Sequence, residues 1–254
     1  MKQAATLLLL AGSLLLSAGT VSAQTTFRLG VRGGANRALT TLAAASNGID
    51  GFNNVSADKS AIYAWQAGAV AEVNFGKLAL QPALVFSQKG EKSQTAISSR
   101  DSGFPFNTTQ TSTNRYNWLE LPVNLVYTLH GDHGLQLFAG PYVALAVGGR
   151  QRGTTYPYYG PAIDTRPFDF DNQVSYGSDT PNRHLDAGVN FGIGYRQGPV
   201  QVQLGYGLGL RNLHQASPVS ANPGSTPFPF THDFTADAAY NRVAQLTGTY
   251  FFSL

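Results

Sequence analysis

The histidines are the first residues to consider for acid–base or metal chemistry, because histidine is the side chain whose ordinary pKa lies near neutral pH. His130 and His133 flank Asp132 in a glycine-containing stretch, which offers fewer ligands than the four of a structural zinc site. We interpret that stretch as a solvated turn. His184 and Asp186 lie two residues apart, and we interpret them as a hydrogen-bonded pair with a structural role. We therefore predict no metal site.

Motifs for nucleophilic catalysis and cofactor binding are missing from the sequence. It contains no GxSxG elbow, no Walker phosphate loop and no HExxH helix. It has no cysteine, which removes disulfides and thiolate chemistry. The 17 Lys and Arg residues are scattered and form no basic run, so we expect no nucleic-acid partner. We predict that the protein is not an enzyme and binds no cofactor.

The composition and the first residues together indicate an exported membrane protein. Charged residues are 12% of the chain and hydrophobic residues 43%, which is too polar for a helical membrane protein and poor in charge for a soluble enzyme. Lys2 precedes an apolar run that ends at Leu16, and small residues lead to Ala23. This predicts a secretory signal peptide over 1–23, cleaved after Ala23, because the run is too short for a membrane anchor. Residues 24–254 then form one domain.

Strict alternation of apolar residues with small or polar ones dominates that domain, as in VQVQLGYGLGLRN at 200–212. Such alternation predicts a β-strand with two unlike faces, and a tilted strand crosses a bilayer with about 9–11 residues. We expect such strands at 27–36, 62–75, 78–88, 115–129, 135–148, 183–196, 200–212 and 240–252. The predicted fold class is all-β, an eight-stranded antiparallel up-and-down transmembrane β-barrel.

The connections between these segments alternate in length. Short turns, GK, HGDHG and QGP, alternate with long loops at 37–61, 89–114, 149–182 and 212–239. This layout is typical of a barrel in the outer membrane of a Gram-negative bacterium, and an even strand number leaves both termini periplasmic. A soluble lipid-binding barrel is the alternative, and it would need an apolar interior.

If the apolar face meets lipid, the polar face must fill the lumen, because an eight-stranded barrel is only wide enough for side chains. Buried charges of both signs should pair, and strand direction favours Arg28 with Glu72 and Asp186 with Arg211. The predicted lumen network is Arg28, Arg32, Glu72, Glu120, Asp186, Arg196 and Arg211.

Aromatic residues gather near the two ends of the predicted strands, as expected for interfacial girdles. The predicted girdle residues are Phe27, Tyr63, Trp65, Phe75, Phe86, Tyr116, Trp118, Tyr127, Tyr195 and Phe252. Other aromatics lie in the predicted long loops, where they either pack together over the barrel or form an interaction surface. These are Phe104, Phe106, Tyr156, Tyr158, Tyr159, Phe228 and Phe230.

Several stretches together resemble one known family. They read FRLGVRGGAN, LALQPALVFSQKG, NWLELPVNLVY, LFAGPYVAL, GYGLGLRNL and NRVAQLTGTYFF, and they cover nearly the whole mature chain. This combination is similar to the PorT-type outer-membrane β-barrel domain family of Bacteroidota, a porin family. The resemblance implies a small outer-membrane barrel and implies no shared catalytic residues. The chain ends in FFSL, whereas barrels of this kind often end on Phe.

From these observations we expect a small outer-membrane barrel with a filled lumen and no catalysis. Its role would be structural, or surface interaction through long extracellular loops. The expected partners are outer-membrane lipid or lipopolysaccharide and a surface partner, and we expect a monomer. The alternative is a narrow transport component or accessory of an outer-membrane secretion or transport system.

Overall fold

The computed structural model describes residues 25–43, 54–99, 106–131, 133–158, 166–177, 180, 182–214 and 238–252. Within these ranges the regular elements are all strands, and no helix is long and apolar enough to cross a membrane. The strands are β1 (Thr26–Ala43), β2 (Asn54–Phe75), β3 (Leu78–Ser99), β4 (Phe106–Thr128), β5 (Gly134–Tyr158), β6 (Phe168–Gln173), β7 (Leu185–Gln197), β8 (Val200–Gly209) and β9 (Ala238–Phe252). The predicted signal peptide lies outside the described residues.

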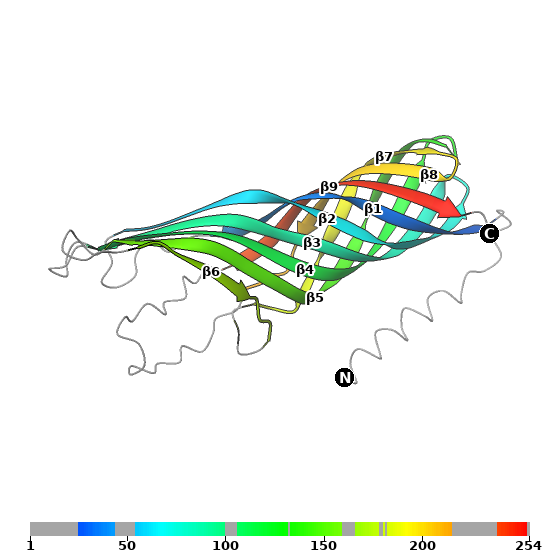
Figure 1. The fold of residues 1–254 in the computed structure, drawn as a ribbon. Coiled ribbons are helices and arrows are strands. Elements are labelled where there is room, and N and C mark those ends of the chain that lie inside the picture. Colours follow the sequence, from blue (N-terminus) through cyan, green and yellow to red (C-terminus); the bar gives the residue numbers. More distant parts are fainter. Residues whose placement is uncertain are drawn as a thin grey trace.

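The strands form one antiparallel, ring-like sheet (Figure 1). Pairing runs from β1 through β2, β3, β4, β5, β7, β8 and β9, and β9 pairs with β1 again. β6 pairs with the far part of β5, at Thr155 to Arg150. The all-β, ring-like architecture predicted from the alternation is confirmed.

Tight turns gather at one end of the ring, called the turn end below. Gly76 and Gly198 have φ of +83° and +56°, a left-handed conformation that glycine adopts without steric cost. Asn74 Oδ1 accepts a hydrogen bond from the Gly76 amide at 2.8 Å and supports the first of these turns. β1 begins and β9 ends at this same end, since Phe252 pairs with Leu29.

The two faces of the ring are inverted relative to a soluble protein. Leu204 is 56% exposed on the outside, whereas its neighbour Gln203 is 2% exposed inside. The alternation continues along β5, where Leu135 and Leu137 point outward and Gln136 points inward. A continuous exposed apolar surface with a polar interior is the pattern of a barrel surrounded by lipid. The polar interior contradicts the soluble lipid-binding alternative.

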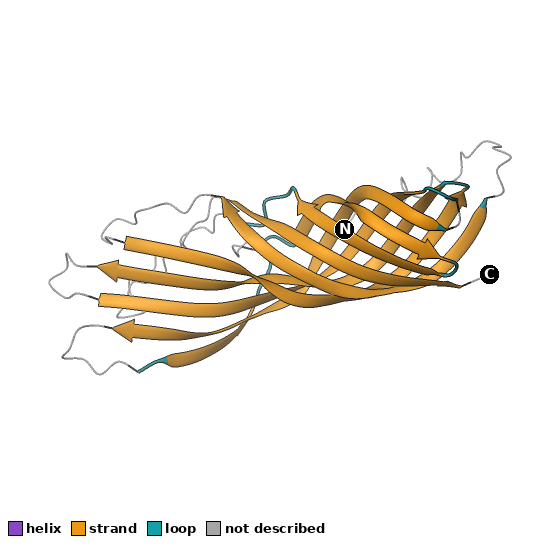
Figure 2. Cartoon of the chain, turned by 90° about the horizontal axis from the view of Figure 1, so that it is seen from above, coloured by secondary structure: helices purple, strands orange, loops and turns teal. Residues whose placement is uncertain are grey.

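The predicted long loops proved wrong over much of their length, because the strands continue through them. β2, β3, β4 and β5 are 22, 22, 23 and 25 residues long and project well past the ring (Figures 1 and 2). β6 lies wholly within a predicted loop. We call this projecting sheet the extension; it consists of residues 54–61, 91–99, 106–117 and 148–158 together with β6.

The sequence does not predict the extension, because the extension lacks an apolar face. Stretches such as SQTAISS and TTQTST place Ser, Thr and Gln on both faces, so no alternation is visible. Threonine nevertheless favours extended backbone, and each strand gains a partner from the strand beside it. Register shifts between Ala61 and Gln66 on β2, and between Asn117 and Trp118 on β4, mark where the ring passes into the extension.

Candidate functional site

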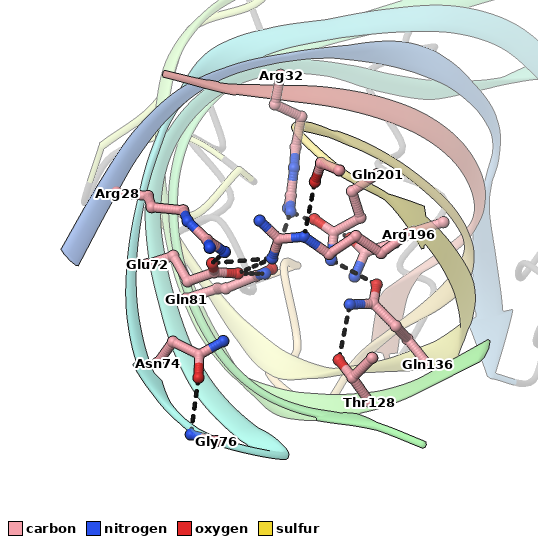
Figure 3. Close-up of polar contacts among 12 residues, drawn as sticks. Arg28, Arg32, Glu72, Asn74, Gly76, Gln81, Thr128, Gln136, Arg196 and Gln201 are labelled. Carbon is pink, nitrogen blue, oxygen red and sulfur yellow. Dashed lines mark hydrogen bonds and ion pairs between the residues drawn. The ribbon is translucent and has the colours of Figure 1, made fainter. Parts of the chain in front are cut away.

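A buried carboxylate organises the polar network nearest the turn end (Figure 3). Glu72 is fully buried, and Arg196 Nη1 donates to its two oxygens at 2.8 and 2.6 Å. Arg28 Nη1 lies 3.3 Å from Glu72 Oε1, and Gln81 Nε2 donates to Oε2 at 2.7 Å. Arg28 and Glu72 are also direct register partners on β1 and β2. One carboxylate therefore compensates two guanidinium groups within the barrel.

The contact between Glu72 and Arg196 crosses the lumen. Four steps of strand pairing separate β2 from β7 in either direction around the ring, so these side chains come from opposite walls. Arg32 adds further bridges, to Thr249 Oγ1 at 3.1 Å and to Gln203 Oε1 at 3.1 Å. A chain of hydrogen bonds runs from Gln201 on β8 through Gln136 on β5 to Thr128 on β4, and these residues lie in the same close-up (Figure 3). Together these contacts close the turn-end half of the lumen.

A second charged cluster lies nearer the extension and centres on Lys89. Its Nζ is 2.7 Å from Glu120 Oε1 and 3.8 Å from Asp186 Oδ2, and all three side chains are buried. The Tyr142 hydroxyl and the Asn241 amide donate to Asp186 Oδ2 at 3.1 and 2.8 Å. The ammonium also lies 4.8 Å from the centre of the Tyr142 ring, a cation–π contact.

Little space remains inside the ring between these clusters. The cavity there, bordered by Arg32 and Glu120, has a volume of about 20 Å³, enough for about one water molecule. Glycines make this filling possible. A Cβ on Gly205 would lie 2.8 Å from the Phe138 ring, and one on Gly192 would meet the same ring at 2.8 Å. Among the described residues, the lumen is therefore packed with side chains.

A larger cavity opens above the Lys89 cluster, at the mouth of the ring; we call it the vestibule. Its volume is about 380 Å³, within the range of about 300–1,000 Å³ found for small-molecule sites. Its lining residues come from the ring, the extension and the connections beside them: Thr40, Lys59, Glu91, Ser93, Thr95, Thr108, Gln110, Ser112, Asn114, Tyr116, Trp118, Gln151, Tyr176, Asn182, Arg183, Leu213, His214 and Ala239.

Glu91 is the hub of the vestibule wall. Its Oε1 accepts hydrogen bonds from Asn114 Nδ2 at 2.8 Å, the Tyr116 hydroxyl at 3.2 Å and Lys59 Nζ at 3.5 Å. Tyr176 closes another side, donating to the Gly148 carbonyl at 3.2 Å. Burial, with a smaller contribution from the negative charge of Glu91, raises the pKa of Tyr176, so its phenol stays protonated at neutral pH.

The predicted lumen residues do not all lie inside. Arg32, Glu72, Glu120, Asp186 and Arg196 are buried, and Arg28 is half-buried.

The prediction that Arg211 lies in the lumen is wrong. Arg211 is exposed, and it lies two residues beyond Gly209, where β8 ends. The predicted pair with Arg211 is therefore wrong, and Asp186 contacts Lys89 instead. Lys89 and Glu91 were missed because the strand was predicted to end at residue 88. Continuing the inward alternation from Ser87 would have found both.

The prediction of an aromatic girdle is also wrong for two residues, Trp118 and Tyr116. Trp118 is 2% exposed and Tyr116 is half-buried, and both line the vestibule. They share the parity of Glu120 along β4, which places them on the inner face. Phe86 is half-buried and stacks on Trp65, with ring centres 5.3 Å apart. The remaining predicted girdle side chains point outward and are exposed: Phe27, Tyr63, Trp65, Phe75, Tyr127, Tyr195 and Phe252.

The predicted loop aromatics are only partly described. Tyr156 and Tyr158 are exposed on the far part of β5. Phe106 begins β4. Phe104, Tyr159, Phe228 and Phe230 lie outside the described residues.

The histidines that the structure describes form no metal-ligand set. The rings of His130 and His133 stack at 5.7 Å on the turn-end surface. The interpretation of His184 and Asp186 as a pair is not supported, since His184 is exposed and Asp186 is buried against other partners. Within the described residues no group of three or more His, Asp or Glu side chains is arranged to hold a metal ion.

Comparison with known proteins identifies the architecture. The family model described as "Outer membrane protein beta-barrel domain" matches residues 22–215. Solved structures similar to the chain include Ail, the attachment invasion locus protein of Yersinia pestis, with 8% identity, a TM-score of 0.38, and 89% of this chain and 98% of Ail covered. Neisserial surface protein A is similar at 10% identity and a TM-score of 0.36, with 88% of this chain and 97% of that chain covered. No curated protein matches the chain.

Proposed function

Because the chain belongs to the outer membrane protein β-barrel domain family, we propose that it is a surface-interaction protein of the outer membrane. Its ring is closed by packed side chains, and its extension presents a binding surface outside the cell. In this proposal eight strands cross the membrane, the protein is a monomer, both termini are periplasmic, and residues 1–23 are removed as a signal peptide. The protein performs no catalysis.

The length of the strands carries this proposal. A tilted strand needs about 9–11 residues to cross a bilayer, whereas β5 has 25. At about 3.4 Å per residue, such a strand is more than twice as long as the hydrocarbon core is thick, about 30 Å. The surplus in β2 to β5 lies on one side of the ring. A transmembrane barrel needs no such sheet to be stable, so the extension supports a role beyond the membrane.

The outward face changes character where the extension begins. On β2 and β5 the last exposed apolar residues before the extension are Tyr63 and Val147, and beyond them Asp58 and Arg150 point outward. Charged side chains are costly in hydrocarbon, so this change supports a membrane boundary at that level. The exposed aromatics at both levels of the ring fit the proposed girdles.

The finer family assignment remains part of the proposal. The combination of LALQPALVFSQKG, NWLELPVNLVY and the other stretches quoted above supports a PorT-type barrel of Bacteroidota, a porin family. Lipid, lipopolysaccharide and a surface partner are the proposed partners.

The topology is testable because the chain has no cysteine. Gln94→Cys places a thiol on an exposed position of the extension, and Lys77→Cys places one in a turn at the other end. Intact cells are treated with a membrane-impermeant maleimide, and lysed cells serve as the control for thiol reactivity. We expect labelling of Gln94→Cys on intact cells and of Lys77→Cys only after lysis. The reverse pattern contradicts the proposed orientation.

The binding role is tested by shortening the extension in register. Lys92 and Thr113 are partners on β3 and β4, so residues 93–112 are replaced by Asn-Gly, a two-residue hairpin turn. Cells displaying either form are applied to surfaces coated with lipopolysaccharide or printed with oligosaccharides, and heat-modifiable gel migration verifies that the barrel folds. We expect retention of wild-type cells and loss with the shortened form. Equal retention of both forms contradicts the proposal.

The alternative is a narrow transport component or an accessory of a secretion system. Transport through the ring would require Glu72 and Arg196 to separate and the Lys89 cluster to open. The packed lumen therefore favours surface interaction, and conductance across a planar bilayer distinguishes the two.

A further inference from the structure

Cationic side chains gather on the outer face of the sheet where the extension begins. We call five of them, all exposed, the basic band: Arg37 on β1, Lys92 on β3, Arg115 on β4, and Arg150 and Arg152 on β5. The other end of the ring differs. Of the lysines and arginines that the structure describes at the turn end, only Lys77 is exposed. Exposed positive charge is therefore concentrated on the extension side.

The basic band lies at the level where the apolar surface ends. Arg37 is the register partner of Tyr63, and Arg115 Nη1 donates to the Tyr63 carbonyl at 3.1 Å. Arg150 lies three residues beyond Val147, a distance of about 10 Å along the strand, or about 8 Å along the membrane normal at a tilt of about 40°. The headgroup layer on each side of the hydrocarbon core is about 5–8 Å thick. In the proposed membrane orientation the basic band therefore meets lipid headgroups.

Carboxylates compensate only part of this charge. Arg150 and Arg152 share a single carboxylate, that of Asp171, at 2.5 and 3.0 Å. Within the described part of the chain, the other three members of the basic band form no ion pair. Arg115 and Arg150 are also direct register partners, and like charges opposite each other destabilise a sheet. The stability of the sheet gives no reason for this arrangement, whereas a bound anion would offset the repulsion.

Two members of the basic band flank a hydroxyl group. Thr113 on β4 is the register partner of both Lys92 on β3 and Arg152 on β5. Neighbouring strands lie about 4.8 Å apart, so the two cationic residues are about 10 Å apart at the backbone, with Thr113 between them. All three residues line one open groove of the extension. The groove therefore presents two cations and a hydroxyl to the same ligand.

From this arrangement we infer that the basic band binds the phosphate groups of lipopolysaccharide in the surrounding leaflet. The inference rests on the proposed outer-membrane role and assigns a site to one of the proposed partners. Phosphate oxygens accept paired hydrogen bonds from a guanidinium group and single ones from an ammonium or hydroxyl group. The basic band supplies all three kinds of donor together with Thr113.

The surface next to the basic band favours a lipid over a soluble polyanion. Tyr63 and Trp65 are 75% and 51% exposed on the outer face of β2, and Leu119 is exposed on β4, four residues from Arg115. Acyl chains pack against such a surface, and aromatic side chains lie at its edge with the headgroups. One molecule that carries both phosphate and acyl chains therefore contacts both surfaces, whereas a soluble polyanion contacts only the cations.

The test measures retention of lipid A, the phosphate-bearing lipid anchor of lipopolysaccharide. The refolded full chain in detergent is titrated with diphosphoryl lipid A, and bound lipid is counted by native mass spectrometry. Dephosphorylated lipid A with the same acyl chains is the matched ligand. We expect saturable retention of the diphosphoryl form and about tenfold weaker retention of the dephosphorylated form, because charge-assisted hydrogen bonds are lost.

A double variant, Lys92→Gln with Arg115→Gln, removes two cations and leaves the ion pairs of Asp171 in place. We expect it to bind diphosphoryl lipid A about tenfold more weakly than the parent. Lys77→Gln removes an exposed cation at the turn end and is the control, which should bind as the parent does. Heat-modifiable migration verifies folding. If the double variant fails to fold, Arg37→Gln with Lys92→Gln replaces it.

Equal retention of the two forms of lipid A overturns the inference, and so does unchanged binding by the double variant. Binding of dextran sulfate without retention of lipid A would assign the basic band to a soluble polyanion and also overturns it.

This test is separate from those of the surface role. Purified protein is titrated, so the result does not depend on the orientation in cells. The form shortened between Lys92 and Thr113 keeps all five residues of the basic band, which faces the lipid of its own membrane. Failure here with correct maleimide labelling and loss of cell retention on shortening leaves the surface role intact. Retention of lipid A without that loss leaves the lipid site intact.

Discussion

Neutralising Glu72 tests most sharply whether its ion pair with Arg196 holds the opposite walls of the lumen together. Glu72→Gln keeps the shape of the side chain but removes the charge that faces Arg196 at 2.6 Å and Arg28 at 3.3 Å. Arg196 is 2% exposed and keeps its contacts with the Gly198 carbonyl and the Phe251 ring, together with one hydrogen bond to the neutral glutamine oxygen. Its guanidinium then lacks a buried counter-charge.

The expected cost follows from this burial. Breaking a buried ion pair by removing one partner destabilises a protein by about 3–5 kcal/mol. The Arg28 contact adds less than about 1 kcal/mol, because that side chain is 30% exposed and screened by water. We expect Glu72→Gln to lose about 3 kcal/mol, at the low end of the range, since the glutamine oxygen still accepts one hydrogen bond.

Urea unfolding of the refolded barrel in liposomes, followed by tryptophan fluorescence, measures this loss. Asp58→Asn, at an exposed carboxylate in the extension, is the control and should change stability by less than about 0.5 kcal/mol. The double variant Glu72→Leu with Arg196→Met removes both charges, and it should be more stable than Glu72→Gln. If Glu72→Gln loses less than about 1 kcal/mol of unfolding free energy, and its loss adds to that of Arg196→Met, the ion pair does not stabilise the barrel.

Three further changes probe the lipid face, the lumen and the extension. Leu204→Arg introduces a charge beside Ile193 on the outer face and should cost about 2–4 kcal/mol in liposome unfolding; a cost near zero would place that face away from lipid. Gly205→Leu drives a side chain into the Phe138 ring and should cost about 1–3 kcal/mol, recovered in part by Phe138→Ala; no loss would show that the lumen is loosely filled. Hydrogen bonds from Arg150 on β5 hold the pKa of Asp171 on β6 below its usual range. The stabilisation that they give to the pairing of β6 with β5 is therefore present at neutral pH, and it is lost as pH falls through that lowered pKa. An NMR titration should show Asp171 returning toward its ordinary pKa in Arg150→Gln, and an ordinary pKa in the wild type would refute the pair.

The ring was predictable because lipid and a packed lumen impose opposite demands on alternate residues. That requirement made the barrel parts of β5 and β8 predictable. Gly76 and Gly198 marked the turns between β2 and β3 and between β7 and β8. The extension carries charged and polar side chains such as Asp58 and Arg150 on its outer face, so its strands show no apolar alternation, and Thr111 and Gln94 looked like loop residues.

The vestibule was missed for a related reason. Trp118 was assigned to lipid by its residue type, although its parity with Glu120 places it inside. Glu91 lies three residues beyond the predicted strand end, and its importance depends on Asn114, which only strand pairing brings beside it. Pairing between distant segments is not visible in a single alternating stretch.

The claim that the lumen is closed by packed side chains is tested most directly by planar-bilayer recording of the refolded protein, with a porin of known conductance as the positive control. With Glu72 bound to Arg196 across the ring and a cavity of only about 20 Å³ above, we expect no steady channel openings. Steady, reproducible conductance steps from the wild-type protein would contradict this account and favour the transport alternative.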